Sequence, residues 1–206
     1  MAASTHFPRL VGTEAIDSGG APHAAAETPP VRGVRLELDD VYREHFAFVW
    51  RSAKRLGVRD AALDDVVQEV FVIVHRRLSD FEGRSSLRTW LFGITLRVTR
   101  DHKRSVARKS PDGEVDPDTL GATTPDPGES LEKAEAVRLL YAILDEMDDD
   151  RREIFVMVEL EQMAMPDIAA TLGVNVNTAY ARLRAARQTF EAALARHRAR
   201  DEWRIR

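Results

Sequence analysis

Apolar residues recur every three or four positions in three stretches of the N-terminal half of the chain, the spacing of helices that bury one face. The first stretch covers residues 38–56 and stops before Gly57, and the second covers 61–78. The third begins at Ser86, a residue type that can cap a helix, and continues to about residue 105. Three amphipathic helices with short connections predict one small bundle.

Helical periodicity returns at residue 130 and continues to about residue 195. Three consecutive aspartates, 148–150, predict a cap and a negatively charged first turn for the helix that contains Ile154. A short helix over 166–172 is followed by Gly173, which supplies the left-handed conformation that a tight turn needs. The last helix would bury an apolar stripe in which two of the four residues are small: Ala179, Leu183, Ala186 and Phe190. Two helices that are joined by a short turn and have this pattern are typical of a helix-turn-helix.

The pattern divides the chain into four parts. Residues 1–35 are rich in Ala, Gly, Pro, Ser and Thr without periodicity, which predicts a disordered tail. Residues 36–107 form the first predicted domain and 130–198 the second. Between them, 108–129 combine proline, glycine and acidic residues, the composition of a flexible linker. No segment alternates with a period of two residues, so we expect an all-α protein of two small helical domains.

The net charge of −4 hides a segregation of charge along the chain. Acidic residues dominate 110–150, whereas basic residues gather in two clusters outside that stretch. One cluster comprises Arg97, Arg100, Lys103, Arg104, Arg108 and Lys109, and the other comprises Arg182, Arg184, Arg187, Arg196, Arg198 and Arg200. Two separate basic clusters predict two local anion-binding surfaces on a globally acidic protein.

The third predicted helix combines cations with aromatic residues. Arg97, Arg100 and Arg104 are three and four positions apart, so they share one face, opposite the apolar one. Trp90 lies near the start of this helix and Lys103 near its end. Cations can follow the backbone of a single DNA strand while a ring stacks on an unpaired base. The alternative is that Trp90 belongs to the core and the arginines are only solvated.

The last predicted helix presents side chains suited to duplex DNA. The second helix of a helix-turn-helix lies in the major groove, where Asn and Arg can bond base edges and other cations neutralise phosphates. The candidates are Asn177, Thr178, Tyr180, Arg182, Arg184 and Arg187. The alternative is an ordinary helical hairpin with a solvated Arg-rich face.

The second predicted helix has an acidic and amide-bearing side that includes Asp64, Asp65, Gln68 and Glu69. Such a face is either simply solvated or a docking surface for a protein partner, and the pattern fits both.

Catalytic and metal chemistry find no support in the sequence. The histidines at 45, 75 and 102 have neither metal-ligand spacing nor a nucleophile beside a base, and there is no cysteine. We therefore expect no enzyme, no cofactor and no metal. The chain has no apolar run long enough to span a membrane and no export signal, which predicts a cytoplasmic protein without membrane insertion.

From about residue 38 to 195 the chain resembles the sigma-70 family, in its extracytoplasmic-function (ECF) group. The resemblance is carried by DDVVQEVFVIVHRRL from Asp64, FEGRSSLRTWLFGI from Phe81, and DIAATLGVNVNTAYARLRAAR from Asp167. It implies a sigma-2-like bundle for the −10 promoter element, a sigma-4-like domain for the −35 element, and a tether between them. The implied function is to bind core RNA polymerase and direct transcription initiation at specific promoters, without catalysis.

The resemblance also implies roles for individual residues. Asp65, Gln68 and Glu69 would contact the polymerase, and Trp90 would lie in the strand-opening segment. The −10 recognition helix would contain Arg97, Arg100, Asp101 and Arg104, with Lys103 beside them, and the −35 helix Thr178, Arg182, Leu183 and Arg187. Many members of the group are held inactive by an anti-sigma factor, so such a partner is implied as well.

Three positions depart from the common pattern of the group. Arg97 occupies a position that is commonly Asn, Tyr180 one that is often Lys, and Ala181 one that is often Ser, which bears on the promoter sequence.

One other function fits part of the chain. A stand-alone helix-turn-helix regulator would account for the C-terminal domain but leaves the acidic and basic helices of the first domain without a role.

Overall fold

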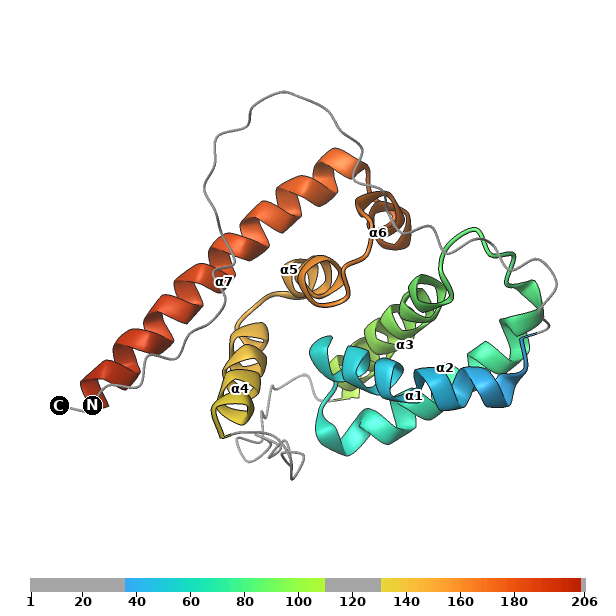
Figure 1. The fold of residues 1–206 in the computed structure, drawn as a ribbon, viewed down its shortest axis with the longest axis horizontal. Coiled ribbons are helices and arrows are strands. Elements are labelled where there is room, and N and C mark those ends of the chain that lie inside the picture. Colours follow the sequence, from blue (N-terminus) through green and yellow to red (C-terminus); the bar gives the residue numbers. More distant parts are fainter. Residues whose placement is uncertain (1–35, 110–130, 205–206) are drawn as a thin grey trace.

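The protein is described by a computed structural model over residues 36–109 and 131–204, and across those residues its regular structure is helical (Figure 1). The N-terminal half contains α1 (Leu38–Arg55), α2 (Asp60–Arg77), a 3-10 turn (Leu78–Asp80) and α3 (Leu87–Lys109). The C-terminal half contains α4 (Leu131–Asp145), α5 (Asp149–Phe155), a π-helical turn η2 (Val156–Leu160), α6 (Met165–Leu172) and α7 (Val176–Arg204). The expected all-α class is confirmed. The predicted tail 1–35 and most of the predicted linker lie outside the described residues.

The three N-terminal helices form a bundle in which each contacts the other two. Its centre holds Val49, Val70 and Leu91, which have no exposed surface. Ser86 caps α3 as expected, because its hydroxyl accepts a hydrogen bond from the backbone N–H of Thr89 at 3.0 Å. The helical spacing therefore identified the helices of this bundle and their buried faces.

The C-terminal half is organised around α5 and α7, which contact each other extensively. Asp148 caps α5 by accepting a hydrogen bond from the backbone N–H of Arg151 at 2.9 Å, as its position in the sequence predicted. Gly173 ends α6 with φ 68° and ψ 32°, the left-handed conformation expected there. The side-chain oxygen of Asn175 then accepts from the backbone N–H of Thr178 at 2.7 Å and fixes the start of α7.

Two helices are longer than the sequence pattern predicted. The third helix ends at Lys109 rather than near residue 105, so the first two residues of the predicted linker are helical. The last helix continues to Arg204 instead of stopping near residue 195. Both extensions are rich in Ala, Arg and Lys, which favour helix without any buried stripe.

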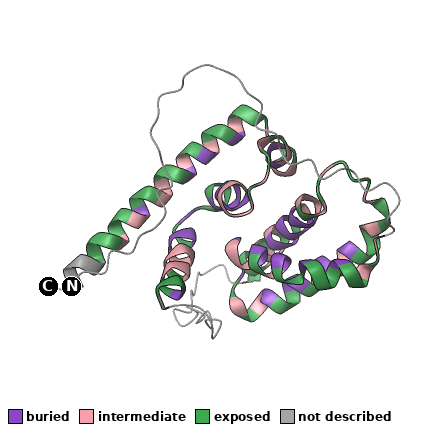
Figure 2. Cartoon of the chain, in the orientation of Figure 1, coloured by how far each residue is buried: buried purple, intermediate pink, exposed green. Residues whose placement is uncertain are grey.

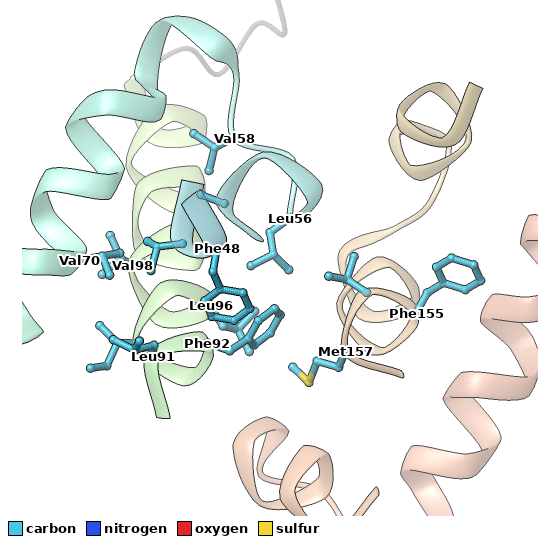
Figure 3. Packing of buried hydrophobic residues seen from close by; sticks show 14 of the residues in the cluster. Phe48, Leu56, Val58, Val70, Leu91, Phe92, Leu96, Val98, Phe155 and Met157 are labelled. Carbon is cyan, nitrogen blue, oxygen red and sulfur yellow. The ribbon is translucent and has the colours of Figure 1, made fainter. Parts of the chain in front are cut away.

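The two halves pack against each other and share one apolar core. Leu56 and Phe92 of the N-terminal half face Met157 of the C-terminal half (Figure 3), and Phe92 and Met157 have no exposed surface. Buried residues lie on α1, α2 and α3 and on α5, whereas α7 is exposed along most of its length (Figure 2). The most extensive helix–helix contacts nevertheless lie within one half or the other, so the halves meet mainly through side chains.

Candidate nucleic-acid interface

The helix-turn-helix presents its predicted DNA face to solvent. Ala179 and Leu183 anchor α7 on its buried side, with exposed fractions of 0% and 5%. On the opposite side Asn177, Arg184 and Tyr180 are exposed, and Tyr180 retains 55% of its surface. A polar and aromatic face beside the turn has the composition that major-groove contacts need.

Other predicted residues of this face already have partners within the C-terminal half. Arg182 lies 3.1 Å from Asp150 and Arg187 lies 2.8 Å from Glu159. Both arginines keep part of their surface, with side-chain exposures of 30% and 54%. Asp150 is mostly exposed, with 61% of its side-chain surface, whereas Glu159 keeps 22%. Exchanging an exposed carboxylate for a phosphate involves little extra desolvation, so the Arg182 pair above all is compatible with DNA binding.

The basic residues of α3 divide into two groups. Arg97 and Arg104 are exposed, and Arg104 pairs with the exposed Asp101 one turn earlier. Arg100 and Lys103 instead turn towards the C-terminal half. The sequence predicted one open face for Arg97, Arg100 and Arg104, and the structure leaves only part of that face open, because α5 lies against the rest.

Arg100 and Lys103 are bound by carboxylates of α5. The Nε of Arg100 donates to Oε1 of Glu153 at 2.7 Å and its Nη2 donates to Oε2, so the guanidinium and carboxylate meet edge to edge. Lys103 Nζ donates to Asp149 Oδ1 at 2.5 Å. The hydrogen bonds to Glu153 raise the pKa of Arg100 above its ordinary value, so it stays protonated.

A second carboxylate of the C-terminal half bridges two cations of the N-terminal half. Glu161, whose side chain is 4% exposed, accepts from Arg55 at 2.6 Å and from Arg88 at 3.2 Å. Arg88 also lies over the ring of Phe48, with its guanidinium carbon 4.4 Å from the ring centroid. Glu161 therefore ties the end of α1 and the start of α3 to the residues that follow η2.

Arg152 occupies the remaining part of the contact between the halves. It is buried, and its Nε donates to the backbone carbonyl of Leu144 at 2.8 Å. Its guanidinium lies against the backbone of Gly57, where an added Cβ would come within 1.7 Å of Nη1. The backbone at position 57 has φ +90°, so both its conformation and this close approach favour glycine there.

Trp90 lies at the rim of the bundle, between the buried core and the exposed surface. It is partly buried, packs on the core, and its ring lies 5.4 Å from that of Phe81. Together with Asp80, Glu82, Arg84 and Ser85, these two rings line a hollow of about 240 Å³. An aromatic wall beside polar groups is suited to stacking a base.

The polar side of α2 borders an apolar groove. Asp65, Gln68 and Glu69 are exposed, and Gln68 lines a groove of about 710 Å³ between α1 and α2. Tyr42, Phe46 and Val72 also line it, and they retain 45%, 36% and 41% of their surface. Tyr42 and Phe46 belong to the apolar spacing of residues 38–56, which favours burial, but their two rings lie at the exposed edge of the buried face and pack with Phe71.

Sequence reasoning did not find the acidic residues that cover α3. Glu153 has the same helical phase as Asp149, four positions earlier, so an acidic face on α5 was visible in principle. Glu161 had no such signal, because its partners Arg55 and Arg88 lie far away in the sequence. Within the described residues no group of histidine and carboxylate side chains could hold a metal ion, and none of the helices there could span a membrane.

Comparison with protein families gives two matches that lie in the two halves. The family described as sigma-70 region 2 matches residues 41–109, and the family described as sigma-70, region 4, matches residues 138–190. The chain is 27% identical over 166 residues to the RNA polymerase sigma factor NccH of Alcaligenes xylosoxydans xylosoxydans, covering 79% of this chain and 89% of the relative. It is 29% identical over 169 residues to the RNA polymerase sigma factor CnrH of Cupriavidus metallidurans, covering 79% and 88%.

Solved structures agree with the fold. The sigma factor RpoE, solved with the anti-sigma factor NepR from Bartonella quintana, superposes with a TM-score of 0.66 at 21% identity over 76% of this chain and 96% of that chain. CnrH, solved with the cytosolic domain of CnrY, superposes with a TM-score of 0.55 at 26% identity over 77% and 87%.

Proposed function

Since the chain belongs to the ECF group of the sigma-70 family and directs transcription initiation, we propose that it does so by binding core RNA polymerase and contacting promoter DNA at two elements. The N-terminal half, predicted as residues 36–107, would bind polymerase and the −10 element. The C-terminal half, predicted as 130–198, would bind the −35 element. The observation that carries this proposal is the exposed face of α7 beside the left-handed turn at Gly173, on the half that matches region 4.

The −35 contact would be made by α7 in the major groove. Asn177 and Arg184 are free to bond base edges, while Arg182 and Arg187 neutralise phosphates after releasing their carboxylate partners. Thr178 and Tyr180 complete this face. Tyr180 stands where the group often has Lys, so a ring contact replaces a charge there.

The −10 contact would combine charge with stacking. Trp90 and the hollow beside it would receive an unpaired base, and Arg97, Arg100, Lys103 and Arg104 would follow the strand. Stacking contributes on the order of 1–3 kcal/mol per base, comparable with the cost of unstacking one step. Strand separation would therefore be favoured by binding and would need no catalytic group.

Polymerase would be held by α2. Asp65, Gln68 and Glu69 provide an exposed polar stripe, and the groove beside it offers apolar surface, the combination of most protein–protein contacts. RpoE is described in complex with an anti-sigma factor and CnrH in complex with the cytosolic domain of CnrY, and we propose that this chain has an anti-sigma partner too.

Run-off transcription on a genomic DNA library, with core polymerase alone and with this protein added, tests the proposed function. We expect new promoter-specific transcripts only when the protein is present. Tight binding of the free protein to duplex promoter DNA, with no added transcript, would favour a stand-alone helix-turn-helix regulator instead.

A further inference from the structure

The first two turns of α7 carry an apolar patch on the side that the helix-turn-helix leaves open. Val176 keeps 40% of its surface and Tyr180 keeps 55%, and Ala181 is exposed as well. Val176 and Tyr180 are four positions apart, so they are neighbours on the helix surface, and Ala181 follows Tyr180 directly. Single exposed apolar residues need no explanation, but three neighbours on the open side of one helix indicate a contact surface.

The core of the helix-turn-helix does not use Val176. On the buried side of the same helix, Ala179 and Leu183 are 0% and 5% exposed. The turn before α7 contributes Val174 to the core, two positions before Val176. The packing is therefore supplied by other residues, and the side chain of Val176 is available to a surface outside the chain.

The backbone that carries Val176 is fixed on both sides. Gly173 sets the left-handed turn before it, with φ +68°. The side-chain oxygen of Asn175 accepts from the backbone N–H of Thr178 at 2.7 Å, and the carbonyl oxygen of Asn175 accepts from that of Ala179 at 3.0 Å. Valine in a helix has one strongly preferred χ1 rotamer, because its Cβ is branched. Its two methyl groups therefore have a defined position, and ordering them costs less rotamer freedom than ordering a long side chain.

Duplex DNA offers an apolar group to such a patch at one base only. In the major groove the C5-methyl group of thymine stands among hydrogen-bond donors and acceptors, and apolar side chains contact it. The N-terminal residues of the second helix of a helix-turn-helix reach the base edges, and Val176 is the first residue of α7. Phosphates and the polar edges of the other bases offer no apolar contact. The patch is therefore suited to thymine.

We propose that Val176 reads the C5-methyl group of a thymine in the −35 element, and that Ala181 and the ring of Tyr180 extend this apolar contact along the groove. The proposal rests on the −35 contact of α7 proposed above and adds a specificity-determining residue to it. Arg184 lies eight positions after Val176, about 12 Å farther along the helix. The methyl contact and the guanidinium contact therefore fall on different base pairs.

Replacement of thymine by uracil tests this contact, because it removes the C5-methyl group and keeps the O4 acceptor and the base pairing. The promoters found by run-off transcription provide the duplex, and each thymine of the −35 element, on either strand, is replaced in turn. Binding is measured with holoenzyme assembled from core polymerase and the full chain. We expect at least one replacement to weaken binding about fourfold, the contribution of one buried methyl group.

Variants of the chain assign this loss to one side chain. Val176→Ala removes both methyl groups from an exposed position and favours helix more than valine does. It should bind the thymine and uracil duplexes equally at the sensitive position. Val176→Ile keeps a branched apolar side chain and should retain the preference for thymine. Val106→Ala is the matched control, because Val106 of α3 is 43% exposed, and it should keep the fourfold difference.

The outcomes separate this inference from the proposed function. Promoter-specific transcription in which no uracil replacement weakens binding, or a −35 element of G·C pairs alone, would overturn the inference and leave the proposed function in place. A preference for thymine that persists unchanged in Val176→Ala would also overturn it, since another residue would then contact the methyl group. An absence of promoter-specific transcripts would overturn the proposed function and this inference together.

Circular dichroism and assembly with core polymerase establish that Val176→Ala is folded. If it is not, Val176→Ser serves in its place, because it also removes the apolar branches from position 176. The same equal binding of thymine and uracil duplexes is expected of it, and a retained preference for thymine would count against the inference in the same way.

Discussion

Two carboxylates of the C-terminal half, Glu153 and Glu161, are almost fully shielded from water, with side-chain exposures of 6% and 4%. A carboxylate in such a place is stable only when its lone pairs are satisfied by donors. Glu153 has one guanidinium arranged edge to edge and Glu161 has two, all from the N-terminal half. Each carboxylate is therefore stable in its buried position only while the two halves are in contact.

Gly173 sets the turn between α6 and α7 through its conformation alone. It has φ +68°, and an added Cβ would meet no atom within 4 Å, so a substitution there acts on the backbone without a clash. Gly173→Ala should lower the free energy of unfolding by about 1–2 kcal/mol, measured by denaturant titration. Gly173→Asn is the matched comparison, because Asn tolerates the left-handed region, and it should lose less. Equal losses would show that the turn does not depend on the left-handed conformation.

His45 gives the N-terminal bundle a pH dependence of known sign. It is 8% exposed, and burial is the main cause that lowers its pKa from the ordinary value of 6.5. As the pH falls below about 6.5, the unfolded chain therefore takes up a proton at this side chain that the folded chain still lacks. The stability that the neutral form contributes is present above that pH and is lost as the pH falls towards the lower, folded-state pKa.

The His45→Leu variant removes this titration from the buried position. Its free energy of unfolding, followed between about pH 8 and 5, should fall less steeply than that of the unsubstituted chain. His75→Gln, at an exposed position of α2, is the control and should keep the original slope. A slope unchanged by His45→Leu would contradict the assignment of this pH dependence to His45.

At the scale of single helices, α2 carries the proposed polymerase contact. Glu69→Lys reverses a charge at the centre of the exposed stripe, and Gln68→Ala removes an amide beside it. Both should weaken association with core polymerase in a pull-down, by about 1 kcal/mol or more for the charge reversal. Glu191→Lys makes the same charge change on the exposed side of α7 and should not weaken it. Undiminished capture of polymerase by Glu69→Lys would place the contact elsewhere.

The helix α7 allows a comparison of two arginines on one element. Arg184 lies beside the recognition face, and Arg198 lies farther along the same helix; both are exposed. Arg184→Ala should weaken binding to a duplex from a responsive promoter by about 1–3 kcal/mol, measured by fluorescence anisotropy. Arg198→Ala removes the same charge and should cost less than about 0.5 kcal/mol. If both variants lost the same affinity, charge in general would account for binding, without a recognition face.

The elements that the sequence predicted well are those with local causes. The apolar stripes of α2 and α3, the cap at Asp148 and the left-handed Gly173 depend on residues a few positions apart, and each is present as expected. The pairing of Arg100 with Glu153 depends on how two halves dock, 53 positions apart in the sequence. Helical periodicity contains no information on such a contact, because it places a side chain on a face without saying what that face meets. The covering of α3 was therefore missed, although every charged residue in it was visible.

At the scale of the whole molecule, the apolar part of the contact between the halves couples their stabilities. Phe92 of α3 has no exposed surface and faces Met157, which follows α5 and is also fully buried (Figure 3). Truncation of a buried methionine costs about 2–5 kcal/mol. Because Met157 lies at the contact, part of that loss should appear in the N-terminal half, which the substitution does not alter.

Hydrogen exchange of backbone amides separates this coupling from a loss confined to the C-terminal half. Met157→Ala should accelerate exchange in α5 and α7 and also in α3 around Phe92, whose cover becomes incomplete. Leu183→Ala is the control: it removes a comparable buried side chain from the helix-turn-helix and should accelerate exchange only in the C-terminal half. Unchanged exchange in α3 of Met157→Ala would mean that the halves are energetically independent. Repeating the exchange measurement at several salt concentrations adds a second test, because salt weakens the ion pairs between the halves but strengthens apolar contacts. With added salt, the excess exchange in α3 should decrease if apolar packing dominates the contact between the halves. It should increase if the ion pairs dominate.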